Sequence, residues 1–153
     1  MRPIFTLCLA ALAVTACGER VDDEHFARDR RVERPENPPP ATEAVPIRIG
    51  EMGANFAACS AAGTTRNLGE GERLPVRAAP FDSSAEAGAI ASGARFHICT
   101  RSHDQRWMGV IYSDDGTIGG QCGVDAPVDA RRAYDGPCRS GWVSSAFVRL
   151  VAG

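Results

Sequence analysis

The segment RFHICTR, residues 95–101, shows the two-residue alternation that decides the fold of this chain. Because side chains in a β-strand point alternately to opposite faces, Phe96 and Ile98 share one face while His97 and Cys99 share the other. The alternation therefore predicts a strand whose hydrophobic core lies beneath Phe96. It also predicts that Cys99 points away from that core, toward whatever segment covers the opposite face.

Turn signals surround this strand on both sides. Glycine, proline, asparagine and Asp-Gly recur at intervals of about ten residues, and no segment keeps a helical period for three turns. The segment NFAACSAAG, residues 55–63, fits either a short helix or a strand. The predicted class is therefore all-β, with strands over residues 63–68, 74–77, 88–91, 95–101, 106–112, 141–143 and 147–151.

The N-terminus has the pattern of a secretory signal. Arg2 precedes an apolar run over residues 4–14, which is shorter than the roughly 20 apolar residues of a membrane-spanning helix. The run ends in Val14-Thr15-Ala16-Cys17, which resembles a bacterial lipobox, where the cysteine thiol receives a lipid and becomes the new N-terminus. Residues 1–16 are therefore predicted to be a lipoprotein signal peptide, with lipidation at Cys17. Ordinary signal cleavage after Ala16 is the alternative.

The residue after Cys17 bears on localisation. Gly18 stands there rather than aspartate, which by resemblance to enteric lipoproteins indicates the outer membrane, facing the periplasm. The protein is thus expected to be exported and held in the cell envelope by its N-terminal lipid.

Residues 17–45 differ in composition from the rest of the chain. This stretch is proline-rich, and eight acidic residues outnumber five arginines in it. The stretch has few apolar groups to bury, so burial would offset little of the conformational entropy lost if it became ordered. This predicts a disordered tether. Residues 46–153 form the remaining domain, in which eleven arginines balance eleven acidic residues. This near-neutral domain has no basic excess that would attract nucleic acid.

The six cysteines divide between the signal and the domain. Cys8 leaves with the signal peptide and Cys17 receives the lipid, so an even number remains in the exported domain. An oxidising compartment then predicts two disulfides. Metal binding is the rival interpretation, but no Cys-x-x-Cys pair exists and the histidines have no ligand spacing, so no metal or other cofactor is expected. The four domain cysteines are Cys59, Cys99, Cys122 and Cys138.

Four short motifs, taken in order, resemble a bacterial Src-homology-3-like domain. They are Leu74-Pro75-Val76-Arg77, Ala89-Ile90 with Gly93, Arg106-Trp107-Met108-Gly109-Val110 and Gly141-Trp142-Val143-Ser144-Ser145. The resemblance covers residues 74–150, about half the chain. It implies a small, partly open five-stranded barrel with its core in that range, of a kind often found as an accessory module in cell-envelope proteins.

The chain departs from this family in two places. Residues 113–140 replace a tight hairpin with a long insertion that contains Cys122 and Cys138, and an N-terminal extension contains Cys59. Set against the barrel, these departures suggest the pairs Cys59–Cys99 and Cys122–Cys138. Four cysteines allow three connectivities, and the sequence alone does not select one.

The aromatic residues of the barrel motifs admit two interpretations. Trp142 could seal one end of the barrel, or it could join Trp107, Tyr112 and Tyr134 in an aromatic shelf that binds a ligand. Arg77 could likewise be a structural ion-pair partner or a ligand anchor. The structural interpretation is favoured for both Trp142 and Arg77.

No catalytic motif is found in the sequence, and a non-enzymatic role is expected. There is no Gly-x-Ser-x-Gly, no phosphate-binding glycine loop with lysine, and no zinc-protease helix motif. With the family resemblance, this predicts an envelope lipoprotein that acts as a binding module for peptidoglycan or another envelope component. The alternatives are an inhibitor of a wall-degrading enzyme and an architectural subunit of an envelope complex.

Overall fold

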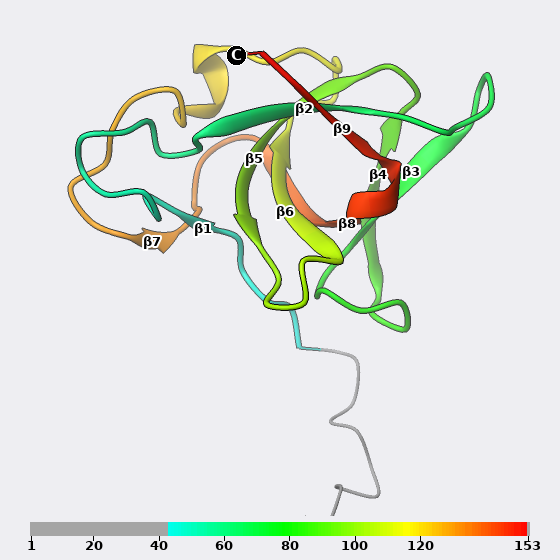
Figure 1. The fold of residues 1–153 in the computed structure, drawn as a ribbon, viewed down its shortest axis with the longest axis horizontal. Helices are drawn as coiled ribbons and strands as arrows, with labels where there is room; N and C mark the ends of the chain where they lie inside the picture. Colours follow the sequence, from blue (N-terminus) through cyan, green and yellow to red (C-terminus); the bar gives the residue numbers. More distant parts are fainter. Residues whose placement is uncertain (1–42, 153) are drawn as a thin grey trace, which may run out of the picture. The chain divides into compact units, whose positions relative to one another are not determined.

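The described part of this computed structural model, residues 43–152, is made of β-strands and two short 3-10 turns (Figure 1). The predicted signal peptide, Cys17 and nearly all of the predicted tether lie outside the described residues. Residues 43–152 include no helix with the length and hydrophobicity that a membrane span requires. The elements are β1 (Arg48–Ile49), β2 (Ala61–Thr65), β3 (Arg73–Arg77), β4 (Glu86–Ala91), β5 (Arg95–Arg101), β6 (Trp107–Tyr112), η2 (Gly120–Cys122), β7 (Arg132–Ala133), β8 (Arg139–Ser144), η3 (Ser145–Phe147) and β9 (Val148–Val151).

Seven strands form one antiparallel sheet in the order β4-β3-β8-β6-β5-β2-β9, and β1 pairs with β7 in a separate ribbon. The sheet does not close, because β4 and β9 remain as its two edges. The all-β prediction is therefore confirmed. The main sheet extends upstream of the range predicted for the barrel core, because β2 precedes residue 74 and pairs with both β5 and β9. The ambiguous segment 55–63 contributes the start of this strand.

The inner face of the sheet encloses the first of two hydrophobic clusters, the inner core. Its residues come from β3, β4, β5, β6, β8 and β9, so the sheet must curl to bring them together. Phe96 is fully buried in this cluster and Ile98 lies beside it, as the alternation in RFHICTR predicts. The other buried members are Leu74, Val76, Ile90, Met108, Val110, Tyr112, Val143 and Val148.

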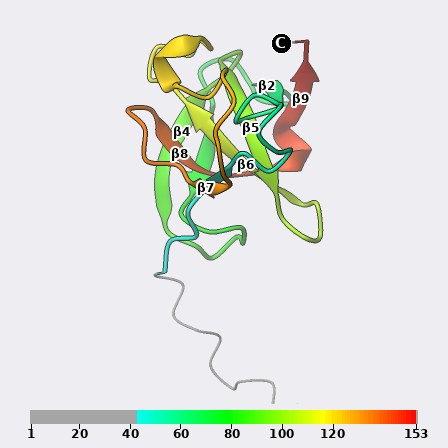
Figure 2. The same cartoon turned by 90° about the vertical axis from the view of Figure 1, so that its left-hand side faces the viewer.

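A second cluster, the outer core, covers the opposite face of β5, β6 and β8. Cys99, Trp107 and Trp142 point into it from the sheet, and the extension and the insertion cover them with residues such as Ile47 and Val124. Figure 2 shows the β1–β7 ribbon in front of the main sheet on this side. Every residue of β6 is buried, because both faces of that strand are covered. A domain of this size thus gains a second buried layer from segments outside the predicted barrel.

The two disulfides hold this outer layer in place. Cys59–Cys99 joins the extension to β5, and Cys122–Cys138 closes the insertion on itself. These are the pairs that the departures from the family suggested. Both bridges lie at the outer core, where Cys59, Cys99 and Cys122 are buried and Cys138 is half-buried.

Trp142 is buried, but not where the structural interpretation placed it. It alternates with Val143 along β8, so Val143 faces the inner core while Trp142 faces the outer core. The indole Nε1 donates a hydrogen bond to the carbonyl oxygen of Val45 at 2.8 Å. Trp142 therefore attaches the start of the extension to the sheet and does not seal a barrel end.

Candidate functional site

The aromatic residues singled out in the sequence do not form one exposed shelf. Trp107 and Trp142 lie in the outer core, and Tyr112 lies in the inner core on the other side of the sheet. Tyr134 is half-buried against the outer core. These positions are separated because neighbouring residues of one strand face opposite layers. The shelf is thus a prediction that the side-chain directions do not support.

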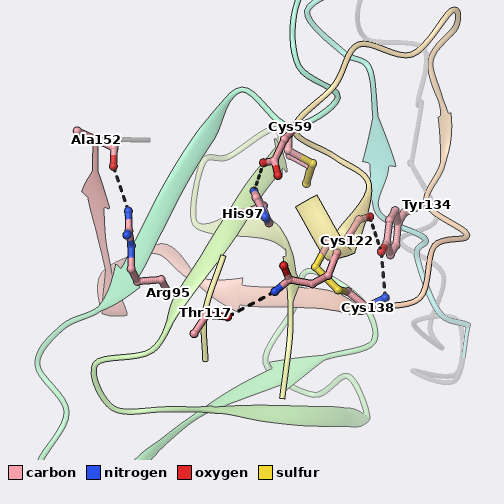
Figure 3. Close-up of polar contacts among 11 residues, drawn as sticks. Cys59, Arg95, His97, Thr117, Cys122, Tyr134, Cys138 and Ala152 are labelled. Atoms are coloured by element: carbon pink, nitrogen blue, oxygen red, sulfur yellow. Dashed lines mark hydrogen bonds and ion pairs between the residues drawn. A yellow bond between two sulfur atoms is a disulfide. The ribbon is translucent and has the colours of Figure 1, made fainter. Parts of the chain in front are cut away.

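Tyr134 has a polar role within the insertion. Its hydroxyl donates to the carbonyl of Cys122 and accepts from the backbone N–H of Cys138, each at 3.0 Å (Figure 3). The tyrosine thus joins the two halves of the Cys122–Cys138 loop. Arg77 is also held locally, since its Nη1 donates to the carbonyl of Ser84 at 3.2 Å. From the sequence, an ion pair was predicted for Arg77, but its hydrogen-bond partner in the structure is a backbone carbonyl.

A cleft opens where the insertion meets β2 and β9. Its volume is about 470 Å³, and it is open to solvent. Apolar side chains from β2 and β9 and from Ile118 provide most of its wall, with Ser60, His97 and Asp125 as its polar side chains. The lining residues are Ala57, Cys59, Ser60, Ala61, Ala62, His97, Ile118, Gly119, Asp125, Leu150 and Val151.

His97 lies in the wall of this cleft and pairs with Asp125. The histidine is 4% exposed, whereas the Asp125 side chain is 50% exposed. His97 Nδ1 is 3.6 Å from Asp125 Oδ1, too long for a good hydrogen bond but close enough for the carboxylate to favour the protonated imidazole. The other ring nitrogen, Nε2, is buried without a hydrogen-bond partner among the described residues.

Burial decides the protonation of His97. Desolvation lowers the pKa of its imidazole below 6.5, and this effect outweighs the opposing influence of the Asp125 carboxylate and of the Gly119 backbone. At neutral pH the pair is therefore a neutral imidazole beside a carboxylate, which makes one negative charge. The sulfur of Cys59 at the same cleft belongs to a disulfide and offers no thiolate.

Sequence reasoning missed this cleft, although one signal pointed toward it. The alternation of β5 placed His97 on the outward face, where a covering segment was expected. The covering segment proved to be the insertion, which brings Asp125 to His97. Within residues 43–152, no group of three or more histidine, cysteine, aspartate or glutamate side chains is placed to hold a metal ion.

No family model, curated protein or solved structure matches this chain. The cleft and its His97–Asp125 pair are therefore interpreted from their own geometry and chemistry.

The buried histidine predicts an acid-sensitive fold. The pKa of His97 is lowered on folding, so the unfolded chain binds a proton more readily than the folded one. The free energy of unfolding is therefore highest above about pH 6.5 and decreases as the pH falls from 6.5 toward the lower pKa of the folded state. The free energy of unfolding should decrease by up to about 1.4 kcal/mol per pH unit, the limit for one proton. Urea unfolding at pH 7.5, 6.5 and 5.5 measures this slope.

The matched variants are His97→Gln, which should lose the slope, and His103→Gln at an exposed histidine, which should keep it. Asp104 and Asp115 do not interfere, because hydrogen bonds lower the pKa of each carboxyl below its usual value of 3.8. An equal slope in wild type and His97→Gln would contradict the prediction.

Proposed function

We propose that this protein is a non-catalytic binding module of the bacterial cell envelope, anchored by lipid at Cys17, and that its cleft beside His97 and Asp125 binds peptidoglycan. The observation that carries the proposal is the cleft itself. Its walls come from the central sheet and from the insertion, and disulfides hold both the extension and the insertion. A concave site of a few hundred Å³ with few polar groups in an apolar wall is typical of ligand sites.

The arrangement of strands supports a Src-homology-3-like barrel as the scaffold. The four motifs that resemble the family lie in or directly beside β3, β4, β6 and β8, all members of one curled antiparallel sheet. The 3-10 turn η3 joins β8 to β9, which pairs back onto β2. The extension and the insertion then add the outer core and one wall of the cleft. Fold alone does not establish a ligand, so the proposal depends on the cleft.

Sedimentation with purified sacculi tests the proposal. The full mature protein should be retained in the pellet, and Leu150→Arg should reduce its apparent affinity about tenfold or more, as loss of an anchoring residue does. Leu150 suits this test because it lines the cleft and is 55% exposed, so its replacement should leave the melting temperature unchanged.

Phe147→Arg is the matched control. Phe147 is 37% exposed just before β9 and does not line the cleft. Its variant should bind sacculi like wild type. Absence of wild-type protein from the pellet, or equal loss in both variants, would count against the cleft as a wall-binding site.

One observation favours a second function, the binding of a protein such as a wall-degrading enzyme. Met52 and Phe56 lie in the loop between β1 and β2, and they are 58% and 53% exposed. A contiguous exposed apolar patch is typical of protein contacts, and these two side chains are four residues apart in one loop. Inhibition of lysozyme by the wild-type protein, relieved in a Met52→Ser/Phe56→Ser variant, would favour this function over wall binding.

A further inference from the structure

The cleft carries a single negative charge within a largely apolar wall. Asp125 is the one residue with a formal charge among those that line it, apart from the titratable His97. Ala61, Ile118 and Leu150 contribute an apolar wall nearby. The Asp125 side chain is 50% exposed, so its carboxylate is accessible to a cationic ligand that also contacts this apolar wall.

Two other acidic residues of the insertion have cationic partners, whereas Asp115 and Asp129 have none among the ion pairs of the described residues. Asp114 pairs with Arg139 at 2.8 Å, and Asp135 pairs with Arg132. Asp125 faces only His97 among the ion pairs of residues 43–152. Since burial keeps that imidazole neutral at neutral pH, the carboxylate charge is left uncompensated. The cleft thus presents one free negative charge to a ligand.

We propose that the cleft recognises a primary ammonium group on a short aliphatic chain, with Asp125 as the counter-ion and Ile118 and Leu150 in contact with the chain. The inference rests on the proposed function and names the part of the wall that is bound: the free side-chain amine of a peptide stem. An alkylammonium combines a compact charge with an apolar stem, which matches a single carboxylate at the border of an apolar wall.

The geometry favours an ammonium over a guanidinium. An arginine side chain pairs best with a carboxylate through two parallel hydrogen bonds that use both oxygens. Oδ1 of Asp125 already faces His97 at 3.6 Å, and His97 is packed in the wall. Less of the carboxylate is therefore free for a two-point contact, whereas an ammonium needs only one oxygen.

The composition of the chain makes the inference unusually easy to test. All 17 basic residues are arginine and none is lysine, so no side chain of the protein supplies a competing primary amine. Acetylation of amines can then be confined to the ligand. Carbodiimide coupling, which joins a carboxylate to a primary amine, also forms no side-chain cross-link within the protein.

The first experiment measures retention of the full mature protein on native sacculi and on sacculi whose free amines have been acetylated. Acetylation should weaken retention about tenfold or more, and Asp125→Asn should weaken retention on native sacculi to the same degree. Asp129→Asn is the matched control, because Asp129 is exposed in the same insertion and does not line the cleft. If neither acetylation of the sacculi nor Asp125→Asn changes retention, the ammonium site is wrong, although the protein still binds the wall.

The second experiment does not depend on sacculi. Nα-acetyl-lysine methylamide is titrated into the protein, and the backbone amide resonances of Gly119 and Asp125 are followed by nuclear magnetic resonance. Saturable shifts are expected, and they should vanish in Asp125→Asn or when the probe amine is acetylated. Carbodiimide with the same probe should modify Asp125 in preference to Asp129, as read by peptide mass analysis.

The two experiments separate the two proposals. If no form of the protein binds sacculi but the lysine probe binds through Asp125, the ammonium site stands and peptidoglycan is not its source. If the probe causes no shift and shows no preference for Asp125, the ammonium site is wrong, whatever the sacculi show.

Discussion

Replacing Trp142 with alanine should lower the free energy of unfolding by about 3–5 kcal/mol, the range for truncating a large buried aromatic residue. The indole is 5% exposed, packs in the outer core, and donates a hydrogen bond to Val45. Its removal leaves a cavity beneath the extension and leaves the Val45 carbonyl without this donor. A small domain has a total stability of only about 5–15 kcal/mol, so the variant should be unfolded or close to it. Urea unfolding followed by circular dichroism measures the loss.

Two further variants divide this effect into its parts. Trp142→Phe keeps an aromatic ring but removes the N–H donor. Because the ring retains most of the packing, this variant should lose less free energy of unfolding than Trp142→Ala. Phe147→Ala, at a 37% exposed aromatic residue of η3, should change the free energy of unfolding by about 0.5 kcal/mol or less. A Trp142→Ala protein as stable as wild type would show that the extension does not depend on this side chain.

Removing the Cys59–Cys99 disulfide should cost about 3.9 kcal/mol, and removing Cys122–Cys138 about 3.1 kcal/mol, as upper values from chain entropy for their loops. The sequence separations are 40 and 16, so the longer loop gives the larger effect. Paired Cys→Ala variants and urea unfolding test each bridge separately. Equal stability with and without the Cys59–Cys99 bridge would contradict this prediction.

Loss of the bridges should also loosen the outer layer before the sheet. The extension and the insertion have little strand pairing of their own beyond the two-residue ribbon of β1 and β7, whereas β5, β6 and β8 pair along most of their length. In hydrogen exchange of the reduced protein, amides of the insertion should therefore lose protection first. Simultaneous loss of protection in β6 would show that the outer layer and the sheet unfold as one unit.

Local pattern determined a large part of this architecture. The alternation in β5 predicts which of Phe96 and Cys99 faces the inner core, because side-chain direction in a strand depends only on position along it. The recurrent turn signals predict an all-β chain for a similarly local reason. The even count of domain cysteines, together with the predicted export signal, predicts two disulfides, and both are present.

Other features required contacts between segments far apart in the chain. Alternation places Trp142 and Val143 on opposite faces, but it does not say that the outward face is covered, so the barrel-end position predicted for Trp142 was wrong. The place of β2 in the sheet likewise depends on its pairing with β5 and β9.

The cleft depends on tertiary structure most of all. His97 and Asp125 lie on β5 and on the insertion, and no sequence spacing relates them. Their approach follows from the way in which the outer core, including Cys122 and Val124, holds the insertion against the sheet. A charge pair formed by such long-range packing has no local periodicity to reveal it. The strand and its outward-facing histidine were therefore determined by the sequence alone, whereas the carboxylate beside that histidine, and the free charge it presents, were decided only by the tertiary structure.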